Sequence, residues 1–248
     1  TNQNFTSSTD NYNIGVGFNA GEQITTGTHN TFIGGKAGDA ITTSNSNTAI
    51  GYEALTAETS SNGNVAIGEA ALKVQNVGGS GDARNTAVGL LAGADISTGQ
   101  QNVFVGALAG SNATSADDST LIGYYAGGNG TMTGHDNVCV GSHAGYNVTA
   151  GRNVLVGRFA GASNIYLTTG VANVLIGDNA RVNSSSMSNA IVMGELVTGT
   201  GNNAFTFGNG ATDSNIDFGA TSITAPSDER YKEEISTSTA GLSFVNDL

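Results

Sequence analysis

The chain has 248 residues, of which 11% are charged, and 20 acidic against 8 basic residues give a formal net charge of −12. This balance argues against nucleic acid or an anionic membrane as a partner. Thirty-seven glycines, one proline and no tryptophan leave few large side chains for a globular core. No apolar run approaches the roughly 18 residues of a membrane-spanning helix, so we expect no membrane insertion. Because the chain begins with Thr1 and no leader opens it, we expect a soluble fragment or processed product.

Residues 1–12 precede the regular part and are interpreted as an N-terminal lead-in. From residue 13 to residue 181 a nine-residue phrase returns about every 17 positions. It reads Asn, three residues that are apolar or Thr, Gly, two variable residues, Ala and Gly. Ten copies can be read, with Ser119 replacing the Asn once. Such a period predicts an all-β stacked repeat, a β-solenoid or β-prism rod.

Four slots of the phrase are nearly constant, and two successive copies illustrate them. The Asn, the last β-branched residue, the Gly and the Ala are Asn85, Val88, Gly89 and Ala92 in one copy, and Asn102, Val105, Gly106 and Ala109 in the next. An Ala that is kept in all ten copies predicts an interior slot with room for one methyl group. We interpret the Asn column as structural, either as a hydrogen-bonded ladder or as an αL-tolerant cap of each turn.

The segment from Asn85 to Gly89 illustrates the strand expected in each repeat. Its middle residues are apolar or Thr, and a strand that is apolar on both faces must be covered on both. One face can turn into the coil, which we expect to contain a second strand and two turns. The simplest cover for the other face is two more copies of the chain. The sequence therefore predicts a parallel homotrimer, intertwined or side by side.

Two insertions interrupt the 17-residue spacing, around residues 78–82 and 165–170. Insertions in a solenoid leave the core as loops, and loops often carry function. We therefore expect receptor contacts in the loops or at one end of the rod. The candidates are Gly78, Asp82 and Arg84 in the first loop and Tyr166 in the second, because a tyrosine suits sugar stacking or protein contact.

The phrase weakens beyond residue 181. Met193–Gly194, Phe207–Gly208 and Phe218–Gly219 are shortened echoes of its strand end. We therefore interpret residues 182–220 as tapering, irregular β repeats.

Two resemblances bear on function. Residues 11 to 220 resemble the short Asn-x-Ala-Ile-Gly repeats of trimeric autotransporter adhesin heads and the repeats of phage tail fibres. Residues 225–235 read Ala-Pro-Ser-Asp-Glu-Arg-Tyr-Lys-Glu-Glu-Ile. They resemble the opening of the C-terminal intramolecular chaperone domain of phage tail fibres and endosialidases, with Tyr231 in place of the usual Leu. Residues 221–248 are thus interpreted as the truncated start of such a domain.

The chaperone resemblance implies a self-cleavage pair. In that family the domain assembles the trimer and then cuts itself off, and the reacting residues correspond to Ser227 and Lys232. The cut would fall between Pro226 and Ser227. Beyond this self-cleavage we expect no enzyme, and we expect no cofactor or metal. Cys139, the single cysteine, occupies an apolar slot and is interpreted as a buried hydrophobe.

These features leave three functional classes. We expect a structural homotrimeric fibre of a phage or phage-derived injection particle, located on the virion and outside the cell. Its partners are itself, other fibre or baseplate proteins, and a host receptor that is a glycan or a protein. The alternative is a bacterial trimeric adhesin head. A glycan-degrading tailspike fits less well, because it needs paired carboxylates and only Asp117 and Asp118 are adjacent in the repeats.

Overall fold

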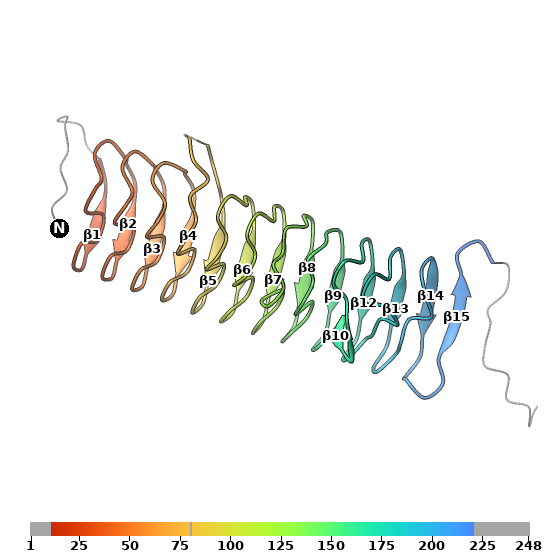
Figure 1. Ribbon diagram of the computed structural model, residues 1–248. Helices are drawn as coiled ribbons and strands as arrows, with labels where there is room; N and C mark the ends of the chain where they lie inside the picture. Colours follow the sequence, from red (N-terminus) through yellow and green to blue (C-terminus); the bar gives the residue numbers. More distant parts are fainter. Residues whose placement is uncertain (1–10, 80, 221–248) are drawn as a thin grey trace, which may run out of the picture.

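A computed structural model describes residues 11–79 and 81–220, and these form a straight β-solenoid without helices (Figure 1). Each coil of about 17 residues contributes one short strand to a 13-stranded sheet that runs the length of the rod. The predicted all-β solenoid is confirmed. The strands of the sheet are β1 (Ile14–Val16), β2 (Thr31–Ile33), β3 (Thr48–Ile50), β4 (Val65–Ile67), β5 (Thr86–Val88), β6 (Val103–Val105), β7 (Thr120–Ile122), β8 (Val138–Val140), β9 (Val154–Val156), β12 (Val174–Ile176), β13 (Ile191–Met193), β14 (Ala204–Phe207) and β15 (Ser214–Asp217).

The strands pair in parallel with identical phrase positions opposite each other, as in Ile14 opposite Thr31 and Val16 opposite Ile33. The register survives both insertions. The first lies between β4 and β5, where Val65 still faces Thr86. The second contains a small antiparallel hairpin of β10 (Ala162–Ser163) and β11 (Ile165–Tyr166), yet Val154 still faces Val174. Inserted residues therefore leave the coil and do not shift the sheet.

Apart from the β10–β11 hairpin of the second insertion, each coil contains one strand, so the expected second strand is wrong. Only isolated parallel bridges mark where it would lie, for example Ala113 opposite Met132. The rest of the coil consists of turns that still bond from coil to coil, as when Gly93 N–H donates to Ala109 O at 2.9 Å. Left-handed backbone conformations recur along these turns, and they keep the peptide groups paired without β geometry.

The core is a narrow file of side chains inside the coils. The middle residue of strands β2–β9, β12 and β13 is buried, and the largest of these side chains, such as Phe32, Phe104 and Leu121, are fully buried. The Ala column, on the turn that follows each strand, is fully buried at every position, as its constancy predicted. Its members are Ala20, Ala37, Ala54, Ala71, Ala92, Ala109, Ala126, Ala144, Ala160 and Ala180.

The solenoid continues past residue 181, and the last strand of its sheet runs in the opposite direction to the others. Met193 and Phe207, two of the shortened echoes, end β13 and β14, which extend the parallel sheet. β15 then pairs with β14 in the antiparallel direction. Phe218 follows β15 directly. An antiparallel strand covers the hydrogen-bonding edge that a parallel stack would leave open at β14.

Candidate functional site

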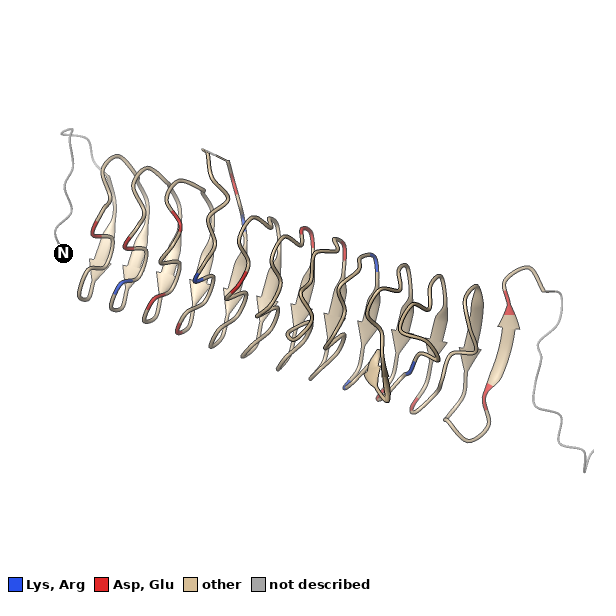
Figure 2. Ribbon diagram, viewed as in Figure 1, with Lys and Arg blue, Asp and Glu red and all other residues tan. Residues whose placement is uncertain are grey.

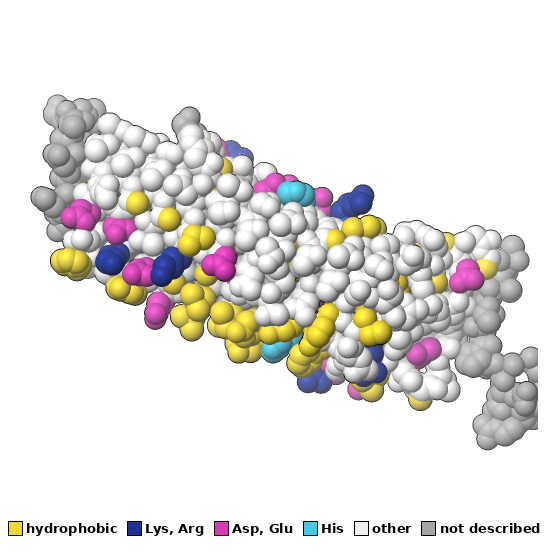
Figure 3. All heavy atoms as spheres, viewed as in Figure 1, with side chains coloured by type: hydrophobic (Ala, Val, Ile, Leu, Met, Phe, Trp, Pro, Cys, Tyr) yellow, Lys and Arg dark blue, Asp and Glu magenta, His cyan; other side chains and the backbone are white. Residues whose placement is uncertain are grey.

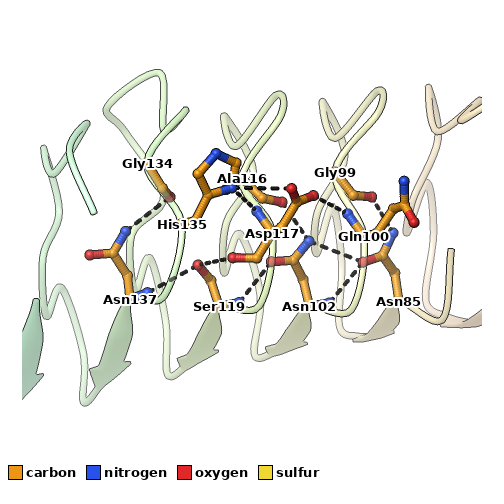
Figure 4. Close-up of polar contacts among 10 residues, drawn as sticks. All are labelled: Asn85, Gly99, Gln100, Asn102, Ala116, Asp117, Ser119, Gly134, His135 and Asn137. Carbon is orange, nitrogen blue, oxygen red and sulfur yellow. Dashed lines mark hydrogen bonds and ion pairs between the residues drawn. The ribbon is translucent and has the colours of Figure 1, made fainter. Parts of the chain in front are cut away.

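The Asn column forms a continuous ladder inside the rod (Figure 4). Asn102 is typical: its backbone N–H and its Nδ2 both donate to Asn85 Oδ1, at 2.9 and 3.1 Å. Its Nδ2 also donates to Ala116 O at 2.7 Å, and its Oδ1 accepts from Ser119 N–H at 3.0 Å. Each amide thus joins three coils. The αL alternative is wrong, because the residue before each Asn takes the positive φ, for example Gln101 at 59°.

The glycine that ends each strand is required by close approach between coils. Gly106 has a φ of +130°, and a Cβ built on it would lie 2.7 Å from Gly123 O. Gly89 meets Gly106 in the same way, at 2.5 Å. The sites Val88 and Val105 directly precede these glycines and point outward from β5 and β6. The repeated residues are therefore parts of the stack.

The first and third residues of strands β1–β9, β12 and β13 point out of the coil, and we call this surface the outer face. It consists almost entirely of Val, Ile and Thr, and no charged residue occurs in these strands. Figure 2 shows charged residues mainly on the turns. The third-position residues Ile33, Ile122 and Ile176 remain 37 to 39% exposed. The outer face is thus an uncovered apolar stripe in the single chain.

The two insertions that supply receptor candidates lie on opposite sides of the rod in Figure 1. In the first, Asp82 accepts a 2.6 Å bond from Arg84 and a 3.0 Å bond from Asn62. The hydrogen bond from Asn62 and the charge of Arg84 lower the pKa of Asp82. Gly78 projects into open space with a φ of +71°. Because Arg84 is paired with Asp82, it is a poor anchor for an anionic ligand.

Tyr166 belongs to a group of neighbouring rings, which we call the aromatic cluster. Its members are Tyr124, Tyr125, His143, Tyr146, Phe159 and Tyr166. His143 stacks on Phe159 with ring centres 4.7 Å apart and on Tyr125 at 5.6 Å. Tyr146 links them to Tyr166, at 6.2 Å. Burial lowers the pKa of His143, so this ring is neutral at pH 7. In Figure 3 hydrophobic side chains gather along the lower edge of the rod, on the turns that follow the strands.

A groove of about 310 Å³ begins at the aromatic cluster and runs along the rod over three coils. One wall consists of Leu91, Leu108 and Tyr125, each two residues after a strand glycine, and the other of Asp95, Asn112 and Asn129, each six residues after it. The floor is Ala94, Ser111 and Gly128. Sequence reasoning missed this groove. Its signal was available in the floor position, where three small residues stand between Lys73 and Tyr146 in the neighbouring coils.

The remaining predicted sites show no arrangement that indicates a function. Ser227 and Lys232 lie outside the described residues. Cys139 is buried between Leu121 and Leu155 of the neighbouring strands, and burial raises its thiol pKa to about 12. This is the inert hydrophobe expected. In residues 11–79 and 81–220 no cluster of three His, Cys, Asp or Glu side chains could hold a metal ion. Over the same residues no helix is long and apolar enough to cross a membrane.

Comparison of the chain with protein-family models, with curated proteins and with solved structures found no match.

Proposed function

We propose that the chain is the β-structured shaft of a homotrimeric fibre, which attaches a phage or a phage-derived injection particle to a host surface. The outer face carries this proposal. Its eleven parallel strands extend over roughly 50 Å, and three residues across a strand span about 10 Å. The stripe therefore presents on the order of 500 Å² per chain, as much as the largest apolar patches of soluble monomers. Two such faces together reach the roughly 1,000 Å² of a specific interface.

The geometry of the stripe favours copies of the same chain as its cover. The stripe is straight, it has the same residue types at every level, and it contains no charge that would need a partner of opposite sign. Parallel rods that meet through one stripe form a closed ring about an axis along the rod. With three copies the stripes enclose a dry central prism and leave the turns facing outward. Residues 225–235, which resemble the start of a tail-fibre chaperone domain, support a phage-type particle over an adhesin head.

Sedimentation equilibrium tests the oligomer directly, and we expect a mass of about three times 24.8 kDa. In Val105→Lys a charge enters the centre of the outer face, and since a buried unpaired ammonium is costly, the trimer should dissociate. Thr98→Lys, on an exposed turn of the preceding coil, is the matched control and should remain trimeric. A folded monomer or dimer of the parent, or a trimer of Val105→Lys with unchanged stability, would contradict the proposal.

Attachment is tested separately by adding labelled trimer to cells of the host and measuring the bound fraction. Competition with intact particles should reduce it.

A further inference from the structure

We propose that the groove beside the aromatic cluster binds a neutral glycan chain, which makes it the receptor-contact site of the proposed fibre and rests on that function. The groove begins three residues past the ends of strands β5, β6 and β7, so it lies on the turns beside the outer face and stays free when that face is covered. Its volume, about 310 Å³, lies at the lower end of small-molecule sites. Its length, over two coil steps of about 4.8 Å, suits a short run of sugar rings lying along the rod.

The floor is shaped to admit a ligand. Ala94, Ser111 and Gly128 rise little above the backbone, whereas the coils on either side have Lys73 and Tyr146 at this position. The Lys73 ammonium is held 2.7 Å from Glu53 Oε2, in the coil further from the groove. Ser111 Oγ donates to Gly128 O at 2.6 Å, which fixes the floor across two coils. The groove is therefore a slot bounded by two large side chains.

The apolar wall offers the surface that a sugar's C–H face needs. Leu91, Leu108 and Tyr125 follow one another from coil to coil, and all three are partly exposed. Tyr125 is held in place by stacking on His143 and by edge contacts with Tyr124 and Tyr146 at 4.8 and 5.5 Å. A ring that is already fixed loses little conformational entropy when a ligand stacks on it.

The opposite wall offers groups for hydroxyls. Asn112 Nδ2 donates to Asn129 O, and Asn129 Nδ2 donates to Asn147 Oδ1, so the amides are oriented by their neighbours. The Asp95 backbone N–H donates to Ser111 O at 3.0 Å. Its side chain is exposed and makes no hydrogen bond or ion pair with the described part of the chain. An ionised carboxylate accepts hydrogen bonds from donors such as sugar hydroxyls. A wall of this kind opposite an aromatic surface matches the two sides of a hexose.

The charges around the groove favour a neutral sugar over an anionic one. The only charged residue lining the groove is Asp95. Burial lowers the pKa of His143, which stacks on Tyr125, so this ring is neutral at pH 7. Arg158, which lies 5.4 Å from the centre of the Phe159 ring, is paired with Asp178 through two 2.9 Å bonds. A sialylated or uronic-acid chain would place its carboxylates against Asp95 without a compensating cation. One carboxylate also falls short of the pair that glycoside hydrolysis requires, so the groove binds without cutting.

The test measures binding of neutral oligosaccharides (maltopentaose, cellopentaose and mannopentaose) and of an oligogalacturonate by titration calorimetry, and by saturation-transfer NMR on the purified protein. We expect at least one neutral oligosaccharide to bind and the anionic one not to bind. Tyr125→Ala should weaken binding about tenfold or more, since it removes the stacking ring. Tyr125→Phe should retain it. Ala is compatible with this backbone, because Ala70 has the same positive φ in an equivalent position. Asp95→Ala should weaken binding as well.

Tyr52→Ala is the control, since it removes a tyrosine that lies on a turn outside the groove and is more exposed than Tyr125. It should bind like the parent. The inference is overturned if none of the three neutral oligosaccharides binds, if Tyr125→Ala binds them unchanged, or if Tyr125→Ala dissociates the trimer, which would assign the groove to contacts between chains. Trimer mass is measured on the same samples. A trimer that binds no sugar overturns this inference but not the proposed fibre. A monomer that binds sugar overturns the proposed fibre but not the binding of sugar by the groove.

Discussion

A single methyl group sets the thickness of each coil at the Ala column. Ala109 is fully buried between Ala92 and Ala126 of the adjacent coils. Ala109→Leu inserts three more carbons into this layer and should destabilise each chain by about 1 to 3 kcal/mol. Thermal unfolding and the yield of purified trimer measure the effect, and in a trimer the damage occurs three times at one level.

Ala107→Leu is the control for this substitution. Ala107 lies on the turn two residues earlier and is half-buried, at the position that Leu90 and Tyr124 occupy in the neighbouring coils. A leucine there should fit with little change in stability. If Ala109→Leu unfolded at the same temperature as Ala107→Leu, the Ala column would not be a packing slot.

At the residue scale, the role of the repeated residues could be predicted from the sequence, whereas the backbone conformation of the turns could not. The Ala and Asn columns were predicted to be structural because they repeat, and they lie in the core and in the ladder. The left-handed positions escaped prediction. They are held by residues such as Lys36, Leu108 and Phe159, whose types carry no signal for positive φ. The stacking of the coils imposes that conformation, which the local sequence does not favour.

At the scale of the structural element, a buried polar network bridges the coils on either side of the first insertion. Glu58 is buried, and its Oε1 accepts the N–H groups of Thr59, Ser60 and Ser61 at 2.8 to 2.9 Å. Gln75 Nε2 donates to Glu58 Oε2 at 3.1 Å, while Gln75 Oε1 accepts from Asn85 Nδ2 at 2.9 Å. The network thereby ties the Asn ladder together where the insertion interrupts the spacing.

This network predicts sensitivity to acid. Burial opposes ionisation of Glu58, but hydrogen bonds from Ser61, Gln75 and Ser60 outweigh it, and the pKa falls below its usual 4.5. A lowered folded-state pKa means that the stabilisation is complete above the unfolded value and is lost as pH falls through the folded one. Urea unfolding should therefore show that Glu58→Gln is less stable than the parent at pH 7. When the pH is lowered below about 4.5, Glu58→Gln should lose less stability than the parent does.

Glu69→Gln, an exposed carboxylate in the following coil, should follow the parent at every pH. If Glu58→Gln lost as much stability as the parent below pH 4.5, Glu58 would not be ionised in the fold.

Aligning the coils would have revealed this network. Glu58 and Gln75 stand seven residues after a strand glycine, where other coils have the buried Ile24, Ile41 and Ile96. The expected second strand failed for a different reason. It was expected from the 17-residue length of the coil, whereas the coil satisfies its peptide groups through repeated left-handed turns, for example Leu108 N–H to Leu90 O at 2.8 Å. Coil-to-coil bonding does not require β geometry.

At the scale of the whole molecule, each coil contacts only its neighbours, so the rod should behave as a one-dimensional stack. Deleting residues 31–47 removes one coil and joins Asn30 to Thr48, which restores the phrase without a break. Asn30 then takes the place of Asn47, whose Nδ2 donates to Ser61 O, as Asn30 does now to Ser44 O. Strand β1 and the coil after it meet the same residue types as before, so the interfaces between coils are conserved.

We expect this deletion to shorten the particle by about 5 Å in small-angle scattering, with the oligomeric state retained and the unfolding temperature nearly unchanged. Deleting residues 31–38 is the counterpart that breaks the period. It carries turn residues into the place of β2 and should give aggregates or a lower unfolding temperature, because one level of the sheet and of the Asn ladder loses its partners. A full-coil deletion that aggregated as readily as the eight-residue deletion would mean that the coils are not equivalent, and that the length of the rod is fixed by contacts beyond its nearest neighbours.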